Sequence, residues 1–304
     1  MEKLEFQFAL TKQQEEAKRK RVDKLLKNPH LIQWRKKYNV DDAFVYAHSG
    51  QFQDYCDVMM KCEDCAGLSF CRQQMKGQRL ELRLDKVLQQ SVCMCEFALQ
   101  EKKKYAHEKQ YRYFDALKEY LLVDVAKLDM SNESQTYKDV VMQVVRVLMD
   151  DDNIKGLYFY GPPGVGKSYL AAGMGNYYAK KGRSVAFVNV AKLIADLKMM
   201  FQDAQAIKQK LRGIQNVDVL ILDDIGGESV TAWSRDEILL PLLDARMQKH
   251  KLTIFTSNYR FEELKDKLAI GNGRVSEPIA ADRILDRIRT LSCEVFVKGC
   301  SRRK

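Results

Sequence analysis

The 304-residue sequence has no long apolar segment. No run approaches the roughly 20 apolar residues that a membrane-spanning helix needs. Residues 1–20, MEKLEFQFALTKQQEEAKRK, lack the apolar block of a signal peptide. Internal repeats and low-complexity tracts are also missing. These absences exclude a membrane protein and predict a cytoplasmic globular protein, and the length is sufficient for two domains.

Cysteine is present but unevenly distributed. Three of the eight cysteines, Cys62, Cys65 and Cys71, fall in the stretch KCEDCAGLSFC. Disulfides are rare in reducing compartments, so a cytoplasmic location favours metal binding or catalysis for such a cluster. The spacing alone leaves a metal site, a disulfide framework and chance open.

The formal net charge is +10, with 51 Lys and Arg against 41 Asp and Glu. A basic protein favours acidic partners, and nucleic acid is the obvious one. Many cytosolic proteins are equally basic without binding DNA, so this charge agrees with a nucleic-acid partner without requiring one.

The pattern along the chain predicts a smaller, mostly helical domain at residues 1–100. Helical periodicity covers residues 9–38, where Pro29 divides it into two helices. A further helix is expected at 40–60, and the alternation in LELRLDKV, residues 80–87, predicts a strand. Residues 101–135 begin with a polar, basic run that is expected to be helical, and they are predicted to be a basic linker.

Residues 136–304 predict an α/β domain. A helix over TYKDVVMQVVRVLMD is followed by five short apolar stretches, most of them separated by helical segments. Buried strands that alternate with helices indicate a parallel sheet with helices on both faces. The five expected strands are GLYFY, SVAFVN, VDVLIL, LTIFTS and CEVFV.

The sequence GPPGVGKS, residues 161–168, matches the P-loop pattern and lies between an expected strand and an expected helix. The glycines allow the backbone N–H groups to face phosphates, and the helix that follows directs its positive end at the anion. Lys167 is expected to reach the β- and γ-phosphates of ATP, and Ser168 to bind Mg²⁺. The expected nucleotide-binding residues are Gly161, Pro162, Pro163, Gly164, Val165, Gly166, Lys167, Ser168 and Tyr169.

Polar side chains end two of the other expected strands. In VDVLILDDIG, Asp223 is expected to hold Mg²⁺ and Asp224 to orient or deprotonate the attacking water. Asn258, which ends LTIFTSN, is a candidate to contact the γ-phosphate or the water. Arg283 and Arg287 lie four apart on one helix face, and their acidic neighbours leave two roles open: salt-bridged surface arginines or an arginine finger.

In this order, the motifs resemble the AAA+ ATPases and, within them, the helicase loaders of the DnaC/DnaI family. The resemblance implies an AAA+ domain whose protomers meet around the nucleotide, with Arg283 or Arg287 as the arginine finger. It also implies an N-terminal domain that grips the hexameric replicative helicase. The stretches that carry it are LILDDIGGESVTAWSRDEILLPLLDARM, TIFTSNY, ADRILDRI and KGCSRR.

The same resemblance implies a zinc-binding fold for the N-terminal domain. A structural zinc requires four nitrogen or sulfur ligands in a tetrahedron. The family places a histidine soon after the third cysteine, but here Arg79 stands in that place and cannot bind zinc. The expectation is therefore an all-cysteine site formed by Cys62, Cys65, Cys71 and Cys95, with Cys93 as the alternate to Cys95.

The function that this resemblance implies is ATP-dependent loading of the replicative helicase onto single-stranded DNA, with hydrolysis that is weak without partner or DNA. The alternatives are a transposition helper ATPase, which organises a transposase on DNA, and a nucleotide-binding adaptor that does not hydrolyse ATP. Residues 102–112 and the helical stretch 191–213 are the candidate DNA contacts. The cofactors expected are ATP, Mg²⁺ and Zn²⁺.

Overall fold

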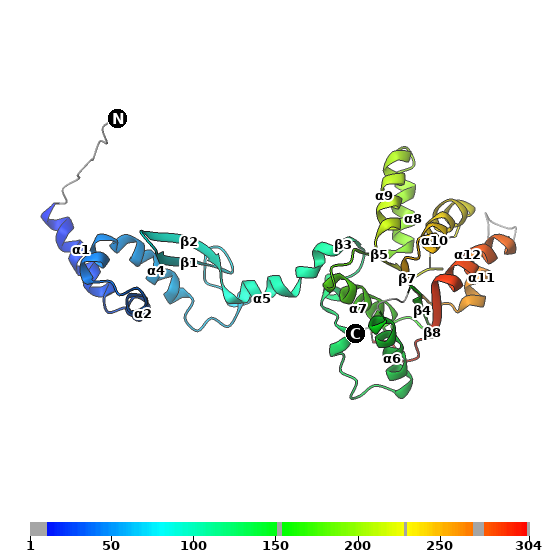
Figure 1. Cartoon of the computed structure of the whole chain (residues 1–304), viewed down its shortest axis with the longest axis horizontal. Helices are drawn as coiled ribbons and strands as arrows, with labels where there is room; N and C mark the ends of the chain where they lie inside the picture. Colours follow the sequence, from blue (N-terminus) through cyan, green and yellow to red (C-terminus); the bar gives the residue numbers. More distant parts are fainter. Residues whose placement is uncertain (1–10, 151–153, 228–229, 270–276, 303–304) are drawn as a thin grey trace. The chain divides into compact units, whose positions relative to one another are not determined.

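The computed structural model describes residues 11–150, 154–227, 230–269 and 277–302. The chain forms two compact units, Met1–Lys103 and Lys104–Lys304 (Figure 1). None of the described helices is both long enough and apolar enough to cross a membrane.

The first unit combines helices with a two-stranded hairpin. Its helices begin where the sequence provides capping groups: the Thr11 side chain accepts a hydrogen bond from Gln14, and Asn28 caps the helix in which Pro29 is the first residue. Pro29 therefore divides the predicted helical region by starting the second helix. The elements are α1 (Lys12–Leu25), α2 (Pro29–Tyr38), α3 (Asp42–Ala47), α4 (Ser49–Lys61), η1 (Leu68–Phe70), β1 (Gln78–Leu84), β2 (Leu88–Met94) and α5 (Glu96–Lys104).

Trp34 joins the helices of this unit to the hairpin. Its ring is 5% exposed, and its Nε1–H donates to the carbonyl oxygen of Leu82 on β1 at 2.8 Å. The ring also packs edge-on against Phe52 of α4, with centroids 4.9 Å apart. The small core around it comprises Val22, Leu25, Leu31, Trp34, Val45, Phe52, Cys56 and Leu82.

The second unit is an α/β domain, as predicted. Its first elements are η2 (Ala106–Gln110), β3 (Tyr111–Phe114), η3 (Lys118–Leu122), η4 (Val125–Lys127), α6 (Gln135–Met149), β4 (Gly156–Tyr160), α7 (Lys167–Lys180), β5 (Val185–Asn189), α8 (Val190–Met199) and α9 (Ala204–Asn216). They are followed by β6 (Val219–Asp223), the π-helix η5 (Trp233–Leu239), α10 (Leu240–Gln248), β7 (Leu252–Ser257), α11 (Phe261–Ala269), α12 (Pro278–Leu291) and β8 (Ser292–Phe296).

The sheet of this unit is parallel and has the strand order β3-β5-β6-β7-β4-β8. All five predicted strands are present. The prediction of five was one strand short, because Tyr111–Phe114, expected in a helical linker, forms the edge strand β3. Its three aromatic side chains are partly buried while Arg112 is exposed, and a four-residue strand of this kind is too short to show a clear alternation among the surrounding basic residues.

Residues 115–127 also pack on this unit. Asn176 of α7 is fully buried, and its Nδ2 donates to the carbonyl oxygens of Tyr120 and Val123 at 2.7 and 2.8 Å. Its Oδ1 accepts a hydrogen bond from the Tyr111 hydroxyl at 2.8 Å. One buried amide therefore holds β3 and the η3 segment against α7.

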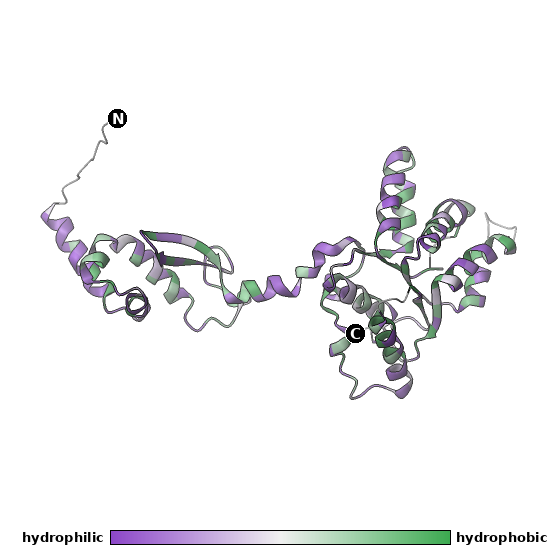
Figure 2. Ribbon diagram, in the orientation of Figure 1, coloured by the Kyte–Doolittle hydropathy of each residue, from purple (hydrophilic) through white to green (hydrophobic). Residues whose placement is uncertain are grey.

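Each face of the sheet is covered by its own set of helices. On one face, Phe159, Phe187 and Ile221 pack in a cluster with residues of α6 and α7. On the other face, Leu220 and Phe255 pack with residues of α8 to α12. The central strands are mostly hydrophobic (Figure 2) and buried along nearly all their length, as expected for a parallel sheet covered on both sides. The carboxylate and amide side chains predicted for the site consequently lie at the ends of the strands.

Arg246 belongs to α10, one of the helices on this second face, and its side chain is fully buried. Burial lowers the pKa of Arg246 to about 9. The guanidinium donates hydrogen bonds at 2.6–3.0 Å to the Thr253 hydroxyl and to the carbonyl oxygens of Gln215, Val217 and Leu252. It therefore joins the segment before β6 to the start of β7, the two strands that carry the predicted carboxylate and amide residues.

We expect Arg246→Met to lower the free energy of unfolding of the second unit by about 3 kcal/mol, because it leaves three buried carbonyl oxygens without a donor. Urea unfolding followed by Trp233 fluorescence in a Trp34→Phe background measures the change. The control Arg212→Met removes an exposed arginine and should change the free energy of unfolding by less than about 0.5 kcal/mol. Equal unfolding midpoints for the two variants would contradict the assigned role.

Candidate nucleotide-binding site

The loop at residues 161–168 connects β4 to α7 and adopts a conformation that requires glycine. Gly161, Gly164 and Gly166 have φ angles of 143°, 84° and 102°, in the region that other residues rarely adopt. A β-carbon on Gly161 would also lie 2.4 Å from the carbonyl oxygen of Val297. The loop ends at the N-terminus of α7, where free backbone N–H groups and the helix dipole favour an anion.

Lys167 is 7% exposed and holds this loop together. Its Nζ donates to the carbonyl oxygens of Gly161 and Pro162, both at 2.8 Å. It also donates to Asn258 Oδ1 at 2.9 Å, across 91 positions of sequence. The ammonium group therefore lies inside the curl of the loop, where phosphate oxygens would compete with these acceptors.

Asp223, the last residue of β6, and Asp224, which follows it, share a partner on β7. The Thr256 hydroxyl donates to Asp223 Oδ1 at 2.7 Å and accepts the backbone N–H of Asp224 at 2.9 Å. Asp224 has a φ of 57°, a left-handed conformation that Asp tolerates better than most residues. Thr256 is 1% exposed, and through these two partly buried hydrogen bonds it orients the Asp223 carboxylate and fixes the backbone of Asp224.

Asn258 connects the loop to these acids. Its Oδ1 accepts from Lys167, and its Nδ2 donates to Asp224 Oδ1 at 3.1 Å. The structure therefore brings together the residues predicted on three separate strand ends. Sequence reasoning missed Thr256, although its position two residues before Asn258, at the end of a buried strand, was a usable signal.

A cavity of about 730 Å³ is lined by these residues. That volume is within the roughly 300–1,000 Å³ typical of small-molecule sites. Ser168 and Asp223 both line this cavity and carry side-chain oxygens, the kind of ligand that Mg²⁺ prefers. Of the predicted loop residues, Pro163, Gly164, Gly166 and Tyr169 also line the cavity, whereas Val165 is buried beneath it. The donor set fits a triphosphate with its magnesium ion.

The two candidate arginine fingers differ in their surroundings. Arg287 donates to Asp244 Oδ1 at 2.7 Å and to Asp286 Oδ2 at 2.8 Å. Arg283 is exposed and makes no hydrogen bond or ion pair with the part of the chain that the structure describes. Neither arginine lines the nucleotide cavity of its own chain. Of the two, Arg283 is therefore the better placed to reach a neighbouring molecule.

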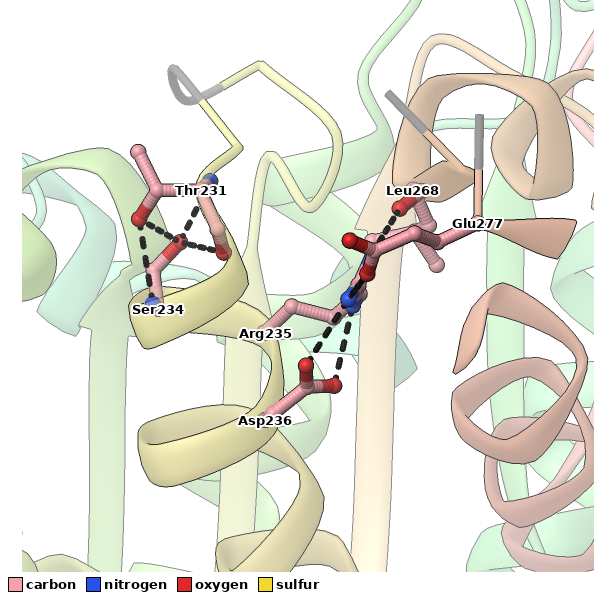
Figure 3. A network of polar contacts seen from close by, with 6 residues as sticks. All are labelled: Thr231, Ser234, Arg235, Asp236, Leu268 and Glu277. Atoms are coloured by element: carbon pink, nitrogen blue, oxygen red, sulfur yellow. Dashed lines mark hydrogen bonds and ion pairs between the residues drawn. The ribbon is translucent and has the colours of Figure 1, made fainter. Parts of the chain in front are cut away.

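Arg235 in the π-helix is the centre of a polar network with Asp236, Leu268 and Glu277 (Figure 3). It is fully buried and donates two hydrogen bonds to Asp236, one to the carbonyl oxygen of Leu268, and one to Glu277. Glu277 directly precedes α12, the helix that carries Arg283. A π-helix is rare and often marks a functional position. Here the π-helix, which follows β6 along the chain, is connected by the Arg235–Glu277 interaction to the start of α12, the helix that carries Arg283.

The predicted zinc site is not supported. Cys62, Cys65, Cys71 and Cys95 do line one cavity of about 120 Å³, but no group of three or more His, Cys, Asp or Glu in the described residues is arranged to hold a metal ion. The sulfurs have protein partners instead. Cys62 accepts from Gln73 Nε2 at 3.1 Å, and Cys71 accepts the Gly77 N–H at 3.4 Å.

Arg79 provides a physical reason for this correction. It lines the same cavity, and β1–β2 pairing places it opposite Cys93, the alternate ligand. A hydrogen bond with Cys93 raises the pKa of the Arg79 guanidinium, and its charge interaction with Cys62 acts in the same direction. A permanent positive charge beside these thiols opposes the binding of a divalent cation.

Comparisons with known proteins agree with this site. The family model described as IstB-like ATP binding protein matches residues 81–304. The chain is 28% identical to the replicative helicase loader DnaI of Bacillus subtilis (strain 168), across 87% of this chain and 85% of that protein. It is 29% identical to the replicative helicase loader DnaC of Escherichia coli (strain K12), across 46% of this chain and about half (52%) of that protein.

Among solved structures, a crystal structure of DnaI matches with a TM-score of 0.53 and 30% identity, and the match covers 65% of this chain and 99% of that one. These matches confirm the predicted α/β class, with its P-loop domain of the AAA+ kind, and the predicted resemblance to helicase loaders.

Thr256→Val should weaken the binding of Mg²⁺-ATP about tenfold, because it removes two partly buried hydrogen bonds worth about 1–2 kcal/mol in total. Because the variant misdirects Asp223, ATP binding in the presence of EDTA should hardly change. Isothermal calorimetry under the two conditions measures both affinities. Thr290→Val, which removes a hydroxyl bonded to its own helix, is the matched control. Unaltered Mg²⁺-ATP affinity in Thr256→Val would refute the anchoring role.

Proposed function

The chain belongs to the family of IstB-like ATP binding proteins, and from this premise we propose that it is an ATP-dependent loader of the replicative DNA helicase. It would deliver the helicase onto single-stranded DNA during initiation or restart of replication. The observation that carries the proposal is the match to DnaI across 87% of the chain. A match of that extent has to include part of residues 1–80, which the family model leaves out.

The second unit would act as the ATPase. Lys167 and the loop N–H groups would bind the β- and γ-phosphates, and Ser168 and Asp223 would hold Mg²⁺, which neutralises phosphate charge. Asp224 would orient or deprotonate the attacking water, within hydrogen-bond reach of Asn258. Arg283 would act as the arginine finger on the nucleotide of a neighbouring protomer.

The first unit would hold the helicase. Several of its apolar side chains are exposed, among them Phe70 at 70%, Met75 at 64% and Val92 at 63%. Exposed apolar groups of this kind are typical of protein–protein contact surfaces. These side chains belong to the η1 and hairpin region, beyond the small core around Trp34.

Single-stranded DNA would be bound by the second unit. The helices α8 and α9, inserted between β5 and β6, expose Lys198, Lys208 and Arg212. Basic side chains on inserted helices suit a phosphate backbone, and such binding weakens steeply with salt. The net charge of +10 agrees with this assignment.

Retention of the cognate hexameric helicase on the immobilised full chain tests the partner assignment directly. A loader should retain the helicase, whereas a transposition helper should retain a transposase instead. The mixture offered to the column should therefore contain both proteins at equal concentration, with and without ATP. Retention of the transposase alone would overturn the loader assignment.

Substitutions in the nucleotide site should separate ATP binding from hydrolysis. Lys167→Ala should lower ATP affinity at least about 100-fold and abolish helicase loading, because it removes the cation that neutralises the phosphates. Asp224→Asn should leave ATP bound and reduce hydrolysis by about 100-fold or more. The measurements are ATP binding, phosphate release and loading onto single-stranded DNA in a reconstituted assay.

Lys180→Ala, at the far end of the same helix, is the matched control and should behave as the wild type. Normal loading by Lys167→Ala would contradict the ATP-dependent function. No turnover by the wild type, even with DNA and helicase present, would favour the adaptor that binds ATP without hydrolysing it.

A further inference from the structure

The segment that follows β8, residues 297–302, runs along the phosphate-binding loop; we call it the C-terminal strap. It starts with a hydrogen bond from the Val297 N–H to the carbonyl oxygen of Tyr160, directly before the loop, at 2.8 Å. It is fastened again by the Arg302 N–H, which donates to the carbonyl oxygen of Gly164 at 2.9 Å. One backbone hydrogen bond therefore fixes the strap to the end of β4, and a second fixes it to the loop.

The side chain of Arg302 is held in one orientation by two partners. Its Nη1 and Nη2 donate to the two carboxylate oxygens of Glu133 at 2.8 and 2.6 Å, which is a bidentate ion pair. Its guanidinium carbon lies 4.1 Å from the centre of the Tyr137 ring, and that tyrosine is 3% exposed. The Arg302 side chain is still 42% exposed, so part of the guanidinium remains available for a further contact.

Arg302 lines the same cavity as the phosphate-binding residues. The lining falls into two chemical groups. One group contains Lys167, Ser168, Asp223, Asp224 and Asn258, the polar residues that suit phosphate and magnesium. The other contains Arg302 and Glu133 with aromatic and aliphatic side chains, namely Tyr120, Leu128, Met130 and Tyr169. An apolar and aromatic lining suits a nucleobase rather than a triphosphate.

We propose that Arg302 is a nucleotide-binding residue that the C-terminal strap contributes to the base and ribose part of the site. The bidentate pair with Glu133 neutralises the guanidinium charge, so the pair exerts little net attraction on phosphate oxygens. What remains is a flat, delocalised surface already stacked on Tyr137, which can stack on or hydrogen-bond a further planar group. This inference rests on the proposed ATP binding and adds a residue to that site.

The test is the affinity of the full chain for ATP, ADP and inorganic tripolyphosphate, measured by calorimetry. Arg302→Ala should weaken ATP and ADP binding by the same factor, roughly tenfold, as expected for the loss of one charge-assisted contact. Tripolyphosphate binding should stay within twofold of the wild type. Lys298→Ala removes an exposed cation from the same strap, does not touch the cavity, and should leave all three affinities unchanged.

The variant Glu133→Gln distinguishes two possible roles of Arg302: direct contact of its guanidinium with the nucleotide, and attachment of the strap through the ion pair with Glu133. It weakens the ion pair but keeps the guanidinium, so its ATP affinity should stay within about threefold of the wild type. A loss as large as that of Arg302→Ala would mean that strap closure, and not the guanidinium, supports binding, and would overturn the proposal.

Two other outcomes of the calorimetry would also overturn it: wild-type affinities in Arg302→Ala, or a loss for ATP and tripolyphosphate that spares ADP. If the wild type itself bound no ATP, the proposed function would fail together with this inference. If the wild type bound ATP and Arg302→Ala bound it with the same affinity, the proposed function would stand and this inference alone would be refuted.

Discussion

One chain of hydrogen bonds, from Lys167 through Asn258 to Asp224, is the interaction on which the rest of the structure depends. It joins the end of β4, the end of β7 and the end of β6, three neighbouring strands of a parallel sheet. A cation, an amide and a carboxylate are thus held next to one another at the edge where parallel α/β sheets place their ligands. A phosphate that took Lys167 from Asn258 Oδ1 would free the amide that also donates to Asp224. The arrangement links occupancy of the loop to the position of the group assigned to water activation.

The remainder of the second unit keeps those strand ends in place. Arg246 fixes the starts of β6 and β7, Thr256 fixes the carboxylates, and Asn176 fixes the edge strand and the η3 segment against α7. Arg235 likewise holds the start of the helix that carries Arg283, through its hydrogen bonds to Leu268 and Glu277. In each case a buried polar group satisfies several backbone or side-chain partners at once. Such a group is costly to remove, because every partner it leaves behind is unsatisfied in a low-dielectric interior.

The sequence made the local features predictable and left the long-range ones undetermined. Apolar runs identified five strands, and the glycine spacing identified the loop around Lys167, because both signals lie within a few residues. The strand at Tyr111 was missed because it is only four residues long and follows a run of basic residues that resembles a helix. Thr256 and Arg302 act through partners 32 and 169 positions away, which periodicity cannot reveal. The zinc prediction came from the family resemblance and is not supported here, where Arg79 lines the same cavity as the four cysteines.

The most direct test of the central interaction is a crystal structure of the full chain with Mg²⁺ and a non-hydrolysable ATP analogue. The account predicts that Lys167 Nζ leaves the carbonyl oxygens of Gly161 and Pro162 for the β- and γ-phosphate oxygens, with Asn258 turned toward the γ-phosphate. A nucleotide bound elsewhere on the chain, or bound in this cavity while Lys167 keeps its present partners, would contradict it.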